Sequence, residues 1–97
     1  MSKTFTVTIY ADAGHAWGKV RKDVLANLGI ADKISRYSYQ RGEYAYLEED
    51  CDLAHLHNAL DAQDTRIKYV EKHTNGTSRI RSYERYEHGY MAVPFLP

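Results

Sequence analysis

The most restrictive feature of this chain is a repeated change of periodicity, from the two-residue alternation of a strand to the spacing of a helix and back. Residues 4–10 alternate strictly, with Phe5, Val7 and Ile9 on one side and threonines on the other. This pattern is typical of a strand with one buried face. The chain therefore begins with a strand, and each later change of period marks a new element.

A helix is predicted next. Trp17, Val20, Val24 and Leu28 recur at helical spacing, which places them on one side of a helix. Gly29 directly follows the last of them, and glycine is the residue that most often ends a helix in the left-handed conformation. We expect one amphipathic helix that begins at Trp17 and ends at Leu28.

Two tyrosine-bearing runs then flank Arg41–Gly42, and this arrangement predicts a hairpin. With these two residues at the tip, Tyr39 faces Tyr44 and Tyr37 faces Tyr46, so that all four rings lie on one side of the sheet. Tyrosine favours strands and is also enriched in protein interfaces. The four rings therefore either cover an exposed sheet face or contact a partner.

The second half of the chain adds a helix and a strand. Leucines at helical spacing follow Asp50 and Asp52, either of which can cap a helix, and residues 66–72 then alternate again. The order β-α-β-β-α-β is that of the ferredoxin-like sandwich. We therefore predict an α+β fold in which four strands form an antiparallel sheet, two helices cover one face and the other face is open.

One domain is expected from a chain of 97 residues, and we place it at residues 1–76. Residues 77–97 then form an extended C-terminal tail, of which 79–83 could add a short edge strand. The end of this tail, 91–97, is uncharged and contains two prolines. Such a segment cannot be a helix, so we expect it to pack on the domain or on a partner.

The compartment is indicated by what the sequence lacks. A single cysteine, Cys51, excludes an internal disulfide and a cysteine-based zinc site. No apolar run approaches the roughly 20 residues that cross a bilayer, and the first residues lack the apolar core of a signal peptide. We therefore expect a cytoplasmic protein with no membrane partner.

Charge is balanced overall, with 13 basic and 13 acidic side chains, but it is sorted along the chain. Residues 43–64 hold no lysine or arginine. Four carboxylates of this segment lie within five positions, namely Glu48, Glu49, Asp50 and Asp52. A helix N-terminus accounts for one or two of them, and the surplus indicates recognition of a basic surface.

A catalytic hypothesis depends on a loop near this acidic cluster. In the predicted sheet the first strand and the strand of residues 44–47 are parallel neighbours, so Asp12 and His15 approach Glu49. A histidine near carboxylates can act in acid–base catalysis or hold a divalent ion. No recognised ligand spacing is present. A small metal-dependent hydrolase is therefore the least favoured hypothesis, and we predict neither a cofactor nor catalytic residues.

A resemblance to RNA-recognition motifs is carried by residues 41–47, Arg-Gly-Glu-Tyr-Ala-Tyr-Leu. They resemble the Arg-Gly-Tyr-Ala-Phe-Val signature of that family with one glutamate inserted, which implies stacking of single-stranded bases on tyrosines of the sheet. Against this function, the first strand offers threonines in place of an aromatic residue, and the net charge is zero. Single-stranded nucleic acid is therefore the second choice of partner.

A wider resemblance covers about the first half of the chain. It is carried by residues 11–17, 28–34, 37–42 and 46–52, which read ADAGHAW, LGIADKI, YSYQRG and YLEEDCD. These segments are similar to segments of small proteins of tailed phages and other bacterial mobile elements. The similarity implies a bacterial host cell as the setting.

Small phage proteins often act by binding a host machine, as inhibitors of CRISPR effectors do. We therefore predict a non-enzymatic protein that binds a host protein, such as a nucleic-acid-binding complex, in the manner of an anti-CRISPR inhibitor. Acidic residues and tyrosines would make the contact, and the rings also suit a homodimer. The predicted binding residues are Glu48, Glu49, Asp50, Asp52, Tyr37, Tyr39, Tyr44 and Tyr46.

Overall fold

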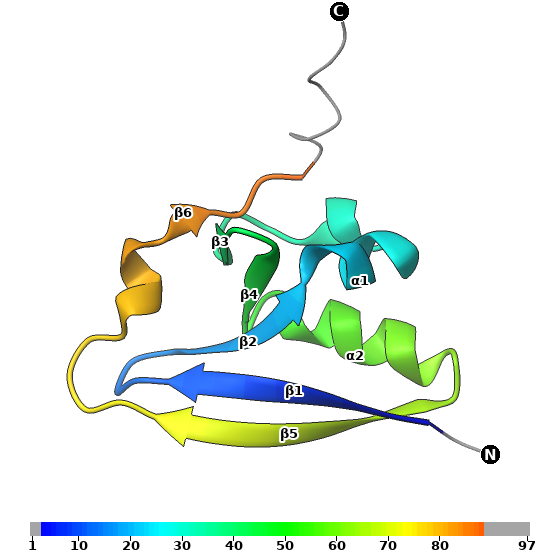
Figure 1. Cartoon of the computed structure of the whole chain (residues 1–97), viewed down its shortest axis with the longest axis horizontal. Helices are drawn as coiled ribbons and strands as arrows, with labels where there is room; N and C mark the ends of the chain where they lie inside the picture. Colours follow the sequence, from blue (N-terminus) through cyan, green and yellow to red (C-terminus); the bar gives the residue numbers. More distant parts are fainter. Residues whose placement is uncertain (1–2, 89–97) are drawn as a thin grey trace, which may run out of the picture.

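A computed structural model describes residues 3–88 and contains a six-stranded sheet with helices on one face (Figure 1). The strands are β1 (Lys3–Ala11), β2 (Ala16–Arg21), β3 (Tyr39–Arg41), β4 (Tyr44–Glu48), β5 (Thr65–His73) and β6 (Glu84–Arg85). The α-helices are α1 (Lys22–Asn27) and α2 (Leu53–Asp61), and the 3-10 helices are η1 (Ala31–Lys33) and η2 (Arg79–Ser82). Within the described residues, no helix has the length and apolar character needed to cross a membrane.

The sheet is mixed, and its order is β5-β1-β2-β4-β3-β6. β1 and β5 are parallel, whereas every other neighbouring pair is antiparallel. The predicted α+β class is confirmed. The chain does not adopt the ferredoxin-like sheet of four antiparallel strands, because β2 lies between β1 and β4, which the sequence predicts to be direct neighbours.

This difference arises at residues 16–21, which the apolar spacing assigns to a helix. They form β2, and the helix begins only at Lys22. Trp17 and Val20 point to opposite faces of the strand, where Trp17 joins an aromatic cluster and Val20 joins the main core. Pairing with β1 and β4 on both sides overrides a weak local preference. Gly29 follows the helix with φ of 75°, as predicted.

The predicted hairpin is present, but its tip is Gly42–Glu43 instead of Arg41–Gly42. Gly42 has φ of 59°, which suits the first central position of a type II′ turn. The register therefore places Tyr39 opposite Tyr46. Tyr37 lies outside the strand in a preceding turn, so the prediction that it shares a sheet face with the other tyrosines is wrong.

The main core lies between the sheet and the two α-helices, which cover the same face in Figure 1. Leu25 of α1 and Leu56 of α2 are fully buried against alternate residues of β1, β2 and β4. The buried residues of this core are Val7, Ile9, Ala11, Ala16, Val20, Leu25, Ile30, Ile34, Ala45, Leu47, Leu56, Leu60 and Tyr86. The leucine stripe predicted for the second helix is thus confirmed as its buried side.

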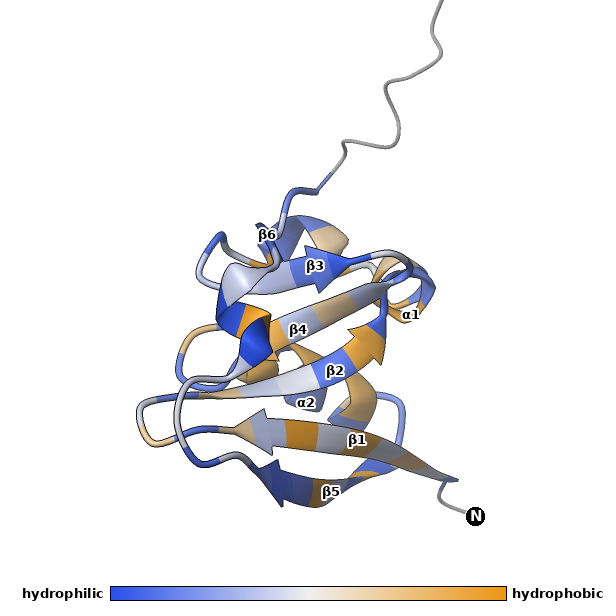
Figure 2. Cartoon of the chain, turned by 60° about the vertical axis from the view of Figure 1, so that its left-hand side comes forward, coloured by the Kyte–Doolittle hydropathy of each residue, from blue (hydrophilic) through white to orange (hydrophobic). Residues whose placement is uncertain are grey.

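The described part of the C-terminal extension, residues 77–88, begins on the opposite face of the sheet at η2 and reaches the main core at Tyr86. Figure 2 shows this face with η2 in front of the strands and α2 behind them. Residues 79–83 contain the 3-10 helix η2 in place of the expected edge strand, and β6 follows it and pairs with β3. The uncharged end at 91–97 lies outside the described residues.

Candidate functional site

The sheet face away from the α-helices carries a row of aromatic rings, and we call it the aromatic face. Strand alternation and register place on it Tyr10, Trp17, Tyr39, Tyr44 and Tyr46. Ile80 of η2 covers three of them, so that Trp17, Tyr39 and Tyr46 are buried. Tyr10 and Tyr44 remain half-buried. Of the four tyrosines predicted to bind a partner, Tyr37 alone is largely exposed, at 67%.

The aromatic face also gathers basic side chains. Of the 13 lysines and arginines, nine lie on this face of the strands or on η2: Lys19, Arg21, Arg41, Arg66, Lys68, Lys72, Arg79, Arg81 and Arg85. Within residues 3–88, Glu48 is the one strand carboxylate that the register places on this face. A chain of zero net charge therefore presents one strongly basic face.

Most of these cations are free to meet a ligand. Arg21 and Arg81 form ion pairs with carboxylates, whereas the other seven have no carboxylate within 4.0 Å among residues 3–88. The ammonium of Lys19 lies 4.2 Å from the centroid of the Tyr44 ring. Such a cation–π contact holds the charge beside the ring. Rings and cations thus alternate on one surface.

A groove of about 560 Å³ lies on this face beside η2. Tyr10 and Tyr46 line it from the sheet, Arg79 and Tyr83 line it from the extension, and Lys19 contributes an ammonium group. Its volume is within the range of small-molecule sites. The groove combines tyrosine rings with two cations. This combination suits a ligand in which a planar ring is linked to an anionic group.

The position of η2 depends on Asp12, at the end of β1. Its carboxylate accepts hydrogen bonds from Arg81 Nε at 2.7 Å, Arg81 Nη2 at 2.9 Å and the backbone N–H of Ser78 at 3.0 Å. The Asp12 side chain is 2% exposed. The Arg81 hydrogen bonds, helped by backbone N–H groups, hold the pKa of Asp12 far below its usual range although burial opposes them. Asp12 therefore has a structural role and is not free to bind a metal.

Asp52 also has a structural role. It is 1% exposed and accepts hydrogen bonds from the hydroxyls of Ser35 and Ser38 and from the backbone N–H of Ser35. It stands at the N-cap of α2, as predicted, but its side chain makes no capping hydrogen bond. Its carboxylate instead ties the segment before β3 to the start of α2, where a partner cannot reach it.

The other members of the acidic cluster differ in exposure. Glu48 is buried, whereas Glu49 and Asp50 are exposed. One oxygen of Glu48, Oε1, accepts hydrogen bonds from the backbone N–H of Asp50 at 2.9 Å and of Cys51 at 2.8 Å. The cluster therefore offers two carboxylates to the outside, and Glu48 orders the turn that carries them.

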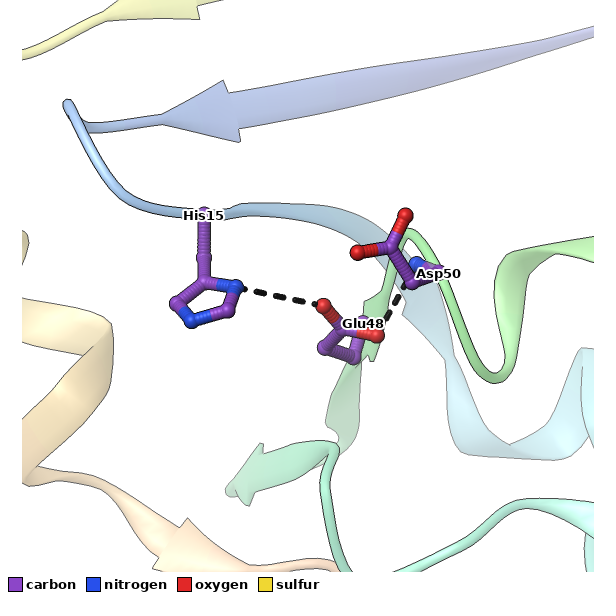
Figure 3. A group of neighbouring side chains, drawn as sticks. All are labelled: His15, Glu48 and Asp50. Atoms are coloured by element: carbon purple, nitrogen blue, oxygen red, sulfur yellow. Dashed lines mark hydrogen bonds and ion pairs between the residues drawn. The ribbon is translucent and has the colours of Figure 1, made fainter.

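Figure 3 shows His15, Glu48 and Asp50 side by side. Nδ1 of His15 lies 3.4 Å from Oε2 of Glu48, and one ligand atom from each of the three residues lies within 4.8 Å of the others. The predicted approach of this loop to the acidic cluster is confirmed, but it occurs because β2 pairs with β4, not because β1 does. Glu49, the predicted third member, is not in the group.

These side chains line a cleft of about 370 Å³ with Trp17 and Cys51. The indole Nε1–H of Trp17 is buried without a hydrogen-bond partner among residues 3–88. Burial, together with the nearby Glu48 carboxylate, raises the pKa of the Cys51 thiol. The cleft thus holds one unsatisfied donor and a thiol that is protonated at neutral pH.

The basic half of the aromatic face was missed by sequence reasoning. The signal was present in residues 66–72, where Arg66, Lys68 and Lys72 occupy the positions that alternate with Ile67. Summing charge over successive segments hid it, because no strand contributes more than three cations to this face. Summing charge over alternate strand positions would have found it.

Comparisons with protein-family models, curated proteins and solved structures find no match for this chain.

Proposed function

We propose that the aromatic face binds single-stranded nucleic acid. The observation that carries the proposal is the placement of nine lysines and arginines on the same face as the tyrosine rings, in a chain whose net charge is zero. Proteins that bind single strands combine a basic groove for the phosphates with rings on which bases stack. The objection that the net charge is zero loses its force, because the charge is sorted in space.

Of the four predicted tyrosines, Tyr44 alone is among the rings available for stacking on this face. Tyr39 and Tyr46 lie beneath η2, whereas Tyr10, Tyr44 and Tyr83 are partly exposed. Tyr10 and Tyr83 border the groove beside η2. A base that enters this groove would meet those rings while Lys19 and Arg79 approach its phosphates. Unpaired bases are needed for such stacking, so a single strand is favoured over a duplex.

Fluorescence anisotropy of a labelled oligothymidylate tests this function. The triple variant Lys19→Ala, Arg41→Ala, Arg79→Ala is expected to bind more than about tenfold more weakly than the wild type. Loss of three phosphate contacts should also make binding less sensitive to salt. The negative slope of the logarithm of the association constant against the logarithm of salt concentration should become smaller in magnitude by about 2. Absence of salt-dependent binding by the wild type would rule out the proposed function.

A control variant that loses the same charge elsewhere distinguishes binding at the aromatic face from a general effect of net charge. Lys3, Lys22 and Lys33 lie outside the aromatic face, Lys3 on the helix side of β1 and the other two in α1 and η1. The triple alanine variant of these residues changes net charge by the same amount and should keep wild-type affinity and salt dependence. Equal losses in both triple variants would show that binding is not located on the aromatic face.

A second candidate function is binding of a host protein, as for a phage-encoded anti-CRISPR-like inhibitor. It is favoured by Tyr37, which is exposed and lines the same cleft as Asp50. Glu49 is also exposed and adds a second carboxylate next to Asp50. The double variant Tyr37→Ala, Asp50→Asn should then weaken capture of a host partner or self-association in sedimentation. Unchanged capture and unchanged sedimentation would remove this candidate and leave nucleic-acid binding unaffected.

A further inference from the structure

We infer that His15, Glu48 and Asp50 form a binding site for one divalent metal ion of the zinc class. The inference is independent of the proposed nucleic-acid binding. The three residues come from the loop before β2, the end of β4 and the turn before α2, and pairing of β2 with β4 brings them together. One ligand atom of each lies within 4.8 Å of the others.

The spacing of two of these atoms, which form an ion pair in the structure, also fits that of two metal ligands. His15 Nδ1 and Glu48 Oε2 are 3.4 Å apart, whereas an N–H···O hydrogen bond spans about 2.7–3.2 Å. Two ligands of a tetrahedral zinc ion, with bonds of about 2.0–2.2 Å, are separated by about 3.4 Å. The pair therefore already has the distance that an ion would require.

The buried carboxylate of Glu48 provides a second argument. Its side chain is 8% exposed, and His15 is its one ion-pair partner among residues 3–88, although Arg81 and Arg85 line the same cleft. Its Oε1 is held by two backbone N–H groups, so Oε2 is the oxygen left for a ligand. A carboxylate removed from water needs a compensating positive charge. A bound divalent ion would supply that charge.

Trp17 provides a third, independent observation. It is 2% exposed and lines the same cleft, and its Nε1–H has no acceptor in the described part of the chain. Buried donors are nearly always satisfied by protein or by ordered water. The wall of this cleft therefore contains a polar group that the described residues leave unsatisfied.

The donor set selects the class of metal. One imidazole nitrogen and two carboxylates suit zinc and neighbouring first-row ions, whereas magnesium and calcium prefer sites built from oxygen alone. Three protein ligands leave at least one position for water or another ligand. His15 and Asp50 are exposed, so both can adjust to the ion without disturbing the core.

Isothermal titration of the purified full chain with zinc chloride, without nucleic acid, tests the site. We expect one ion per chain, and at least a tenfold loss of affinity in His15→Ala and in Asp50→Asn. Both residues are exposed, so circular dichroism should show both variants folded. Glu48→Gln keeps an oxygen for the two backbone N–H groups while removing the charge. Its affinity for zinc should also fall at least tenfold.

Matched controls use residues of the same type outside the cleft. His73→Ala at the end of β5 and Asp61→Asn at the end of α2 should bind zinc like the wild type. Titration with magnesium should give at least tenfold weaker binding than zinc. The site would be refuted by unchanged affinity in folded His15→Ala, by equal losses in the control variants, or by equal affinity for zinc and magnesium.

Discussion

The two faces of the sheet are built from the same strands but have opposite chemistry. On the helix side, Val7, Val20 and Leu47 pack in a core whose residues are aliphatic apart from Tyr86. On the other side, alternate positions carry rings and cations on β2 and β4 and threonines with Tyr10 on β1, covered only in part by η2. The comparison teaches that alternation separates two tasks. One face supplies most of the folding free energy, and the other leaves rings and cations partly exposed.

The largest effect on folding is expected from the helix side. Leu47→Ala removes a fully buried side chain from the main core and should lower the free energy of unfolding by about 2–5 kcal/mol. Thr6→Ala, an exposed position on the opposite face of β1, should change it by less than about 0.5 kcal/mol. Urea unfolding followed by circular dichroism measures both. Comparable losses would contradict the division between the faces.

Gly18→Ala tests how closely α2 approaches the sheet. A Cβ atom at this position would lie 2.8 Å from Leu53 Cδ1 and 3.1 Å from Val7 Cγ1. Overpacking of this kind costs about 1–3 kcal/mol. Thermal unfolding should therefore show a lower Tm than the wild type. A Tm equal to that of the wild type would mean that the helix side has more room than the structure indicates.

The ion pair between Asp12 and Arg81 holds η2 on the aromatic face, and it predicts that the free energy of unfolding depends on pH. The pKa of Asp12 is lowered in the folded chain, so its contribution to stability is present above its unfolded pKa of about 3.9 and is lost as pH falls below that value. Asp12→Asn should therefore be less stable than the wild type at pH 7, and the difference should shrink below about pH 4. Trp17 fluorescence during urea unfolding at several pH values follows this. A difference independent of pH would contradict the role of the ion pair.

Local elements of this fold could be predicted from the sequence, because their signals lie within a few residues. The first strand, the strand of residues 66–72, the leucine stripe of α2 and the end of α1 at Gly29 are all present. Residues 16–21 could not be assigned, because Trp17 and Val20 satisfy a helical spacing as well as a two-sided strand. The choice between them depends on pairing with β1 and β4, which is non-local.

The candidate site was predictable only in part, for a similar reason. The acidic cluster and its proximity to His15 could be inferred, but Asp52 and Glu48 have partners that sequence spacing does not reveal, such as the hydroxyl of Ser35, 17 residues away. The burial of Tyr39 and Tyr46 depends on the path of the extension across the sheet. Contacts between segments far apart in the sequence decided both outcomes.

The smallest effect is expected from a single cation on the aromatic face. Lys68 is exposed on β5 and has no ion pair among residues 3–88. Lys68→Ala should leave the free energy of unfolding within about 0.5 kcal/mol of the wild type. It should reduce the salt slope of oligonucleotide binding by about 0.7. An unchanged slope would show that the basic surface ends before β5.

Nuclear magnetic resonance on the folded chain, titrated with a short oligothymidylate, compares the two faces most directly. Nucleic-acid binding by the aromatic face predicts shifts of the ring signals of Tyr10, Tyr44 and Tyr83, with the methyl signals of Leu25 and Leu56 unchanged. Shifts confined to the leucine methyls, or no shifts at saturating oligonucleotide, would contradict the account.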